Sequence, residues 1–140
     1  MKNYILITVL LLLVSCKPIP FAGHKAYWKI KNGSQIEYNY RIFQNGKLVK
    51  DEKLKKGATC NLFEYEIDEE RVIVFDEINS IMDSVVISAG NKQISWSSRM
   101  ANNSELNFFY EDAWQFEKAA QSADWNNYTW TFTITEEHLK

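Results

Sequence analysis

The stretch of sequence that decides the fold is YTWTFTIT, residues 128–135. Aromatic or aliphatic residues occupy every second position, and threonines occupy the four positions between them. The side chains of a strand point alternately to the two faces of its sheet, and β-branched and aromatic residues favour strands. The stretch therefore predicts a half-buried strand that turns its large side chains toward a core and its threonines toward solvent.

The same alternation recurs earlier in the chain. Residues 26–30 alternate in this way, and so do residues 36–42, which Asn45-Gly46 follows closely. Because Asn-Gly accepts positive φ at both turn positions, it predicts a hairpin that leads into a strand at 47–50. Gly90-Asn91 indicates a second tight turn. Further strands are expected at 60–67, 71–75, 84–88, 93–97 and 106–110.

One segment has a different period. Apolar residues recur there at i, i+4, i+7 and i+11, the spacing of one helical face: Phe109, Ala113, Phe116 and Ala120. Asp112 followed by Gln115 resembles an N-terminal capping box. This pattern predicts a short helix at 112–121.

About eight short strands with regular turn signals indicate an all-β fold. We expect an immunoglobulin-like β-sandwich with one short helix in the C-terminal third. The alternative is a lipocalin-like β-barrel, whose interior would hold a lipophilic ligand. Lipocalins carry their helix after the last strand, whereas this chain places it before that strand, which favours the sandwich.

The amino terminus combines one positive charge, Lys2, with an apolar run at residues 4–14. Eleven residues of helix reach only about 16 Å, roughly half of the hydrocarbon core of a bilayer, so the run fits a signal peptide better than a spanning helix. It ends in Leu13-Val14-Ser15-Cys16, which resembles the lipobox of bacterial lipoproteins. The resemblance implies a signal peptide at 1–15 that is cleaved before Cys16. It also implies acyl chains on Cys16 that anchor the protein in a membrane.

The mature chain is rich in Asn, Lys, Tyr and Ile, and in this it is similar to small lipoproteins of the Bacteroidota. In those bacteria, export to the cell surface is associated with acidic residues after the lipidated cysteine. Residues 17–36 contain four lysines and no Asp or Glu. The resemblance therefore implies an envelope protein anchored in the outer membrane and facing the periplasm, with surface exposure as the alternative. Two prolines at 18 and 20 indicate an extended tether over 16–25, which leaves 26–140 as a single β-sandwich domain.

Composition narrows the classes of partner. The net charge of −2 over 140 residues provides no basic surface for phosphates, so nucleic acid is excluded as a partner.

No catalytic residues, metal ligands or cofactors are predicted, and we do not expect an enzyme. His24 in the tether and His138 near the chain end suit a rigid general base poorly. Cys60, the only cysteine besides Cys16, is expected to be a small core residue, although a reactive or disulfide-bonded thiol is the alternative. The acidic residues between Glu64 and Glu70 could serve a hydrolase, but charge runs are mostly solvated surface.

The five tryptophans fall into two groups. Trp28, Trp96 and Trp130 are in phase with apolar neighbours and are expected in the core. Trp125 lies in a polar segment, and Trp114 lies off the predicted helical face. An indole ring beside amides and carboxylates is typical of sugar-binding sites, because the ring stacks on the sugar while the polar groups bind hydroxyls. The candidate glycan-binding residues are Trp114, Asp124, Trp125, Asn126 and Asn127.

Asp83-Ser84-Val85 resembles the acceptor motif of protein O-glycosylation in the Bacteroidota. The resemblance implies a glycan on Ser84, and the alternative is an ordinary entry into a strand.

Anchor and fold thus predict a membrane-anchored envelope lipoprotein that acts as a non-catalytic binding or accessory module. Its partner would be the membrane through Cys16, together with an envelope protein or a polysaccharide. A glycan-binding module that uses the loop tryptophans is the alternative.

Overall fold

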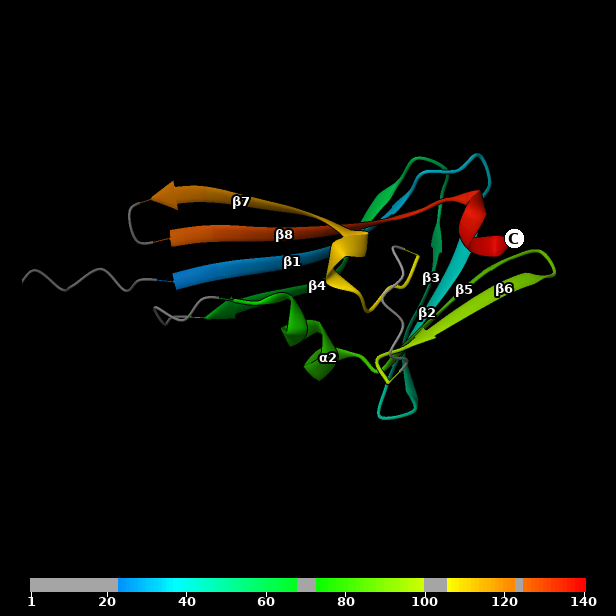
Figure 1. The fold of residues 1–140 in the computed structure, drawn as a ribbon, viewed down its shortest axis with the longest axis horizontal. Coiled ribbons are helices and arrows are strands. Elements are labelled where there is room, and N and C mark those ends of the chain that lie inside the picture. Colours follow the sequence, from blue (N-terminus) through cyan, green and yellow to red (C-terminus); the bar gives the residue numbers. More distant parts are fainter. Residues whose placement is uncertain (1–22, 68–72, 100–105, 123–124) are drawn as a thin grey trace, which may run out of the picture.

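The computed structural model describes residues 23–67, 73–99, 106–122 and 125–140, and there eight strands form two separate sheets. The first sheet has the order β4-β1-β8-β7 and the second has the order β3-β2-β5-β6. Figure 1 shows that the strands of the two sheets run in different directions. The predicted β-sandwich is confirmed. The lipocalin-like alternative is wrong, because the described strands make two open sheets and not one closed barrel.

The first sheet is built around a parallel pair of long strands. It consists of β1 (Gly23–Asn32), β4 (Thr59–Ile67), β7 (Trp114–Ser122) and β8 (Trp125–Ile134). β1 and β8 run parallel, with Trp28 opposite Trp130, while β4 and β7 pair antiparallel on the outside. Paired residues of neighbouring strands point to the same face, so the two indoles stack, with centroids 5.0 Å apart and planes 9° apart.

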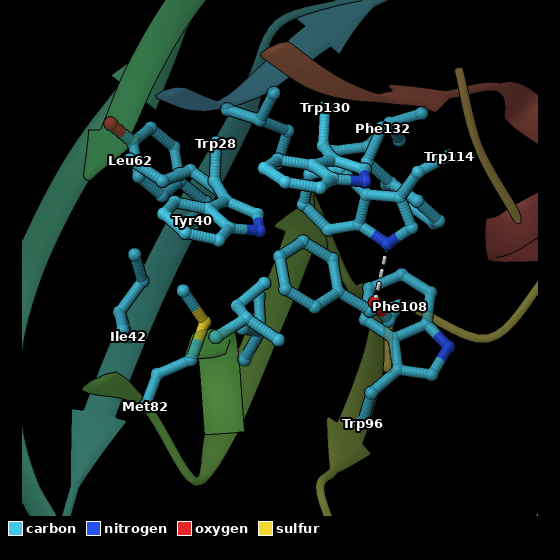
Figure 2. Packing of buried hydrophobic residues seen from close by; sticks show 14 of the residues in the cluster. Trp28, Tyr40, Ile42, Leu62, Met82, Trp96, Phe108, Trp114, Trp130 and Phe132 are labelled. Carbon is cyan, nitrogen blue, oxygen red and sulfur yellow. Dashed lines mark hydrogen bonds between the residues drawn. The ribbon is translucent and has the colours of Figure 1, made fainter. Parts of the chain in front are cut away.

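The second sheet consists of two hairpins: β2 (Tyr38–Gln44) with β3 (Lys47–Leu54), and β5 (Ser84–Ala89) with β6 (Lys92–Ser97). Asn45 and Gly46 both have positive φ, 51° and 70°, which confirms the predicted turn. Gly90, with φ 59°, forms the other predicted turn. Inward-facing residues of this sheet, among them Ile42, pack in one core cluster with the tryptophans of the first sheet (Figure 2).

The predicted helix at 112–121 is wrong. Glu111–Ala113 form a single 3₁₀ turn (η2), and the chain then enters β7. The supposed apolar stripe is not a buried face, since Ala120 is exposed and Phe116 is 49% exposed. Backbone pairing with the whole of β8 stabilises the strand and overrides the helical spacing.

Other helical turns lie outside the two sheets. The single short α-helix of the described residues, α2 (Ile78–Ile81), follows a 3₁₀ turn, η1 (Phe75–Glu77), and another turn, η3 (Glu136–Leu139), ends the chain. The expected strand at 71–75 is wrong for 73–75, which enter η1, and residues 71–72 lie outside the described part. The expected strand at 106–110 is wrong as well, because its described residues form turns. β1 already begins at Gly23, so residues 23–25 belong to the sheet and not to the tether.

Candidate functional site

Trp114 belongs to the core and not to a glycan platform. Its side chain is 6% exposed, and its ring contacts the rings of Phe75, Phe108 and Phe132 at centroid distances of 4.8–5.6 Å. Its indole Nε1 donates a hydrogen bond to the Phe108 carbonyl oxygen at 2.7 Å, drawn as the dashed line in Figure 2. The prediction of a ligand-stacking role for Trp114 is therefore wrong, because its ring is buried among other aromatic rings and its polar atom already has a hydrogen-bond partner.

Trp125 is half-buried at the start of β8, opposite Gly23 of β1. Its six-membered ring lies on the Gly23 backbone, since a Cβ added to that glycine would be 2.2 Å from Trp125 Cζ3. The absence of a side chain at position 23 thus makes room for the indole. The ring covers the entry of the chain into the sheet, yet it keeps some accessible surface.

The two asparagines point to opposite faces of the first sheet. Asn126 shares the inner face with Tyr128, and its Nδ2 lies 3.5 Å from Nδ1 of the buried His24. Asn127 is on the outer face with Trp125, and its buried Oδ1 has no hydrogen-bond partner. Asp124 lies outside the described residues, as does Cys16. Within the described part, the structure therefore brings together only Trp125 and Asn127 of the predicted set.

Ser84 lies in a polar depression of about 520 Å³ at one corner of the second sheet. Its Oγ donates to Asp83 Oδ1 at 3.1 Å, and Asp83 Oδ2 accepts from the Gly46 N–H at 3.0 Å. The remaining lining residues are Asn45, Ser97 and Arg99. The sequence placed Ser84 at a strand entry, which is right, but it gave no signal that three separate segments meet around it. The glycan on Ser84 stays a prediction.

The two acidic side chains of β4, Glu64 and Glu66, form ion pairs with a lysine of the neighbouring strand β1. Lys25 Nζ lies 2.8 Å from Glu66 Oε2 and 3.6 Å from Glu64 Oε1 on the outer face of the sheet. The hydrogen bond to Glu66 raises the pKa of Lys25. Both carboxylates are about half exposed, which fits a solvated sheet face and not an isolated acid–base pair. Asp68, Glu69 and Glu70 lie outside the described residues.

Both histidines are buried, and His138 has a structural partner. Its Nδ1 accepts a hydrogen bond from the Thr135 N–H at 3.1 Å, and its ring lies edge-on to those of Trp96 and Phe132. Burial lowers the pKa of His138. The ring of His24 contacts Tyr128 at 5.5 Å. The Thr135 hydroxyl also lies 3.0 Å from His138 Nδ1, so the one hydroxyl at hydrogen-bond distance from this ring among the described residues belongs to the capping box of η3.

A polar link between the sheets was not predicted from the sequence. The Tyr40 hydroxyl donates to Glu52 Oε2 at 2.6 Å, and Lys50 Nζ donates to the Asn61 carbonyl oxygen on β4 at 2.8 Å. Burial and the Glu52 carboxylate raise the pKa of Tyr40. Cys60, half-buried on β4, is a free thiol that packs against the core, as expected.

The described residues contain no group of three or more His, Cys, Asp or Glu side chains that could hold a metal ion. None of the described helices has the length and hydropathy needed to span a membrane. No protein-family model, curated protein or solved structure matches the chain.

Proposed function

We propose that this chain is a lipid-anchored lipoprotein of the bacterial envelope, and that its β-sandwich is a non-catalytic binding or accessory module. The observation that carries the proposal is the Leu13-Val14-Ser15-Cys16 lipobox, which lies only seven residues before the first strand, Gly23–Asn32. Seven residues span at most about 25 Å when fully extended. An anchor on Cys16 would thus hold the first sheet close to the membrane.

Contacts around the potential catalytic groups support a binding role over catalysis. Thr135 occupies Nδ1 of His138, and Lys25 neutralises the carboxylates of β4. Nucleophilic catalysis needs a base that is free to accept a proton from a neighbouring hydroxyl or thiol. The environment of these groups favours the structural interpretation.

The anchor is tested by replacing Cys16 with Ser. We expect cells grown with an alkyne fatty acid to label the unchanged protein, and to leave the Cys16→Ser variant unlabelled and absent from the membrane fraction. Replacing Cys60 by Ser is the matched control, and it should leave both labelling and fractionation unchanged. A Cys16→Ser variant that still carries the label would refute lipidation at this position.

The expected location is the outer membrane, with the domain facing the periplasm. It rests on the resemblance of residues 1–16 to a signal peptide and lipobox, and on the acid-free segment 17–36. Protease treatment of intact cells that carry a C-terminal tag on this protein separates the two orientations. The tag should survive together with a periplasmic marker, and its removal while the marker survives would place the domain at the cell surface.

Glycan binding is the second candidate function. Trp125 and Asn127 share the outer face of β8 with three threonines, and the half-buried Trp125 ring keeps accessible surface on that face. We expect Trp125→Ala to remove retention on polysaccharide gels. Trp125→Phe should keep part of the retention, since it preserves an aromatic face over Gly23. Equal retention of all three proteins would contradict this candidate, provided that thermal unfolding shows each to be folded.

A further inference from the structure

The polar depression at the corner of the second sheet differs from the other surface features in its lining. It is bounded by the β2–β3 turn, by the start of β5 and by the end of β6, and its six lining residues include no apolar side chain: Asn45, Gly46, Asp83, Ser84, Ser97 and Arg99. Its volume of about 520 Å³ falls within the range of roughly 300–1,000 Å³ that is usual for small-molecule sites. Such a lining suits a ligand that is polar over most of its surface.

The backbone holds the depression in place. The Asp83 N–H donates to the Phe43 carbonyl oxygen at 2.9 Å, and the Asp83 carbonyl oxygen accepts from the Ser98 N–H at 2.9 Å. These bonds continue the ladder across β2, β5 and β6. The side chain of Asp83 then ties the turn to the same point through the Gly46 N–H. The site is therefore formed where a turn and the ends of two strands are tied to one another by backbone and side-chain hydrogen bonds.

The hydrogen-bonding capacity of these residues is only partly used. The Asp83 carboxylate has about four acceptor positions, of which Gly46 and Ser84 occupy two. Ser97 Oγ accepts from the Arg99 N–H at 3.3 Å and can still donate its own proton. The Arg99 guanidinium, which carries five N–H donors, makes no ion pair or hydrogen bond with the residues that the structure describes. The same depression is thus lined by acceptor positions on Asp83 and by donors on Arg99 and Ser97 that the described residues do not use.

The charges in the depression decide between ligand classes. An anion would be attracted by the Arg99 guanidinium but repelled by the Asp83 carboxylate. A cation would be attracted by Asp83 but repelled by Arg99. A neutral ligand with neighbouring hydroxyls satisfies both groups, because one hydroxyl donates to Asp83 while the next accepts from Arg99. Hydrogen bonds to charged groups are about twice as strong as neutral ones.

We propose that this depression is a sugar-binding site that takes a neutral hexose, either free or as a unit of a glycan, with Asp83 and Arg99 holding neighbouring hydroxyls. The proposal rests on the binding role above, but it places the ligand far from Trp125. Figure 1 shows the β2–β3 turn at the bottom of the second sheet, away from the left-hand end where β1 begins. A ligand in the depression would thus lie well away from the point where the chain enters the first sheet.

The test is a titration of the ¹⁵N-labelled full chain, in detergent micelles, with glucose, galactose, mannose and N-acetylglucosamine, each up to about 50 mM, a range suited to weak binding. Dextran distinguishes a unit within a glycan from a free sugar, and inorganic phosphate tests for a simple anion site. We expect at least one hexose or dextran to shift the amide signals of Gly46, Ser84 and Ser97. Shifts confined to the Trp125 indole would support the second candidate function and refute this site. Shifts with phosphate alone, or with no probe, would also overturn the proposal.

Two variants and a control assign the binding to the proposed side chains. Arg99→Gln and Asp83→Asn should each weaken the affinity at least tenfold, since each removes a charge-assisted hydrogen bond. Asp83→Asn keeps an acceptor for the Gly46 N–H, and Arg99 is exposed, so both variants should fold. Arg41→Gln is the matched control, because the Arg41 guanidinium bonds Gln93 on the sheet surface. Unchanged affinity in both test variants would refute the proposal.

Discussion

At the scale of single residues, His138 is held in a fixed position by the last turn of the described chain, η3. Its place two residues before the last residue of the sequence suggests a poorly fixed side chain, yet η3 folds back and buries the ring beside Trp96 and Phe132. The spacing Thr135-x-x-His138 is that of a capping box, and this local signal could have revealed the bond between the two residues. The contact with Trp96 could not be found in this way, because it depends on how the two sheets pack.

His138 predicts a loss of stability on mild acidification. Burial lowers its pKa in the folded protein, so below the unfolded value of about 6.5 the unfolded chain binds more protons than the folded one. The free energy of unfolding should therefore fall as the pH drops from 7 toward 5. His138→Asn, whose Oδ1 can accept from the Thr135 N–H, should flatten this part of the profile. Urea unfolding of both proteins at several pH values measures the effect, and parallel pH profiles would contradict it.

At the scale of elements, the alternation of apolar and polar residues predicted most of the strands well. At β7, in contrast, the helix-like spacing of apolar residues led to the wrong prediction of a helix. The segments around β1, β2, β5, β6 and β8 were found because one face of each is buried and the other is polar. Residues 115–120 of β7 are exposed on both faces of the strand, so their sequence does not alternate between apolar and polar residues as a half-buried strand does. What makes this segment a strand is its pairing with β8, a long-range interaction that a single sequence does not show.

The open edge of β7 also explains a charge that looks misplaced. Lys118 lies on the inner face, opposite Tyr128, with its Nζ 5.5 Å from the centroid of that ring. Edge strands present unpaired backbone groups that can pair with other chains, and inward-pointing charges oppose such pairing. Lys118 and the neighbouring Glu117 thus oppose the pairing of this edge with another chain, which the exposed Phe116 side chain would otherwise favour.

At the scale of the whole molecule, the candidate sites were less predictable than the fold. The predicted glycan-binding residues are neighbours in sequence, but the structure places them on different faces of the sheet, because consecutive residues of a strand point to opposite faces. Trp114 went to the core, Asn126 to the inner face and Asn127 to the outer face. The polar depression, in contrast, joins Asn45, Asp83 and Arg99, which come from three separate segments of the chain. Only the pairing of β2, β5 and β6 brings them together.

The two sheets share one core cluster, and this predicts that they unfold as one unit. Ile30 of the first sheet and Ile42 of the second are both fully buried in that cluster. Shortening either residue to valine removes one methylene and should lower the free energy of unfolding by about 0.5–1.5 kcal/mol. In a two-state protein, each variant shifts the whole transition. Tryptophan fluorescence and far-UV circular dichroism should therefore give the same midpoint for Ile30→Val, and likewise for Ile42→Val. Separate transitions, with each substitution moving only one of them, would show that the sheets are independent and that their shared core does not couple them.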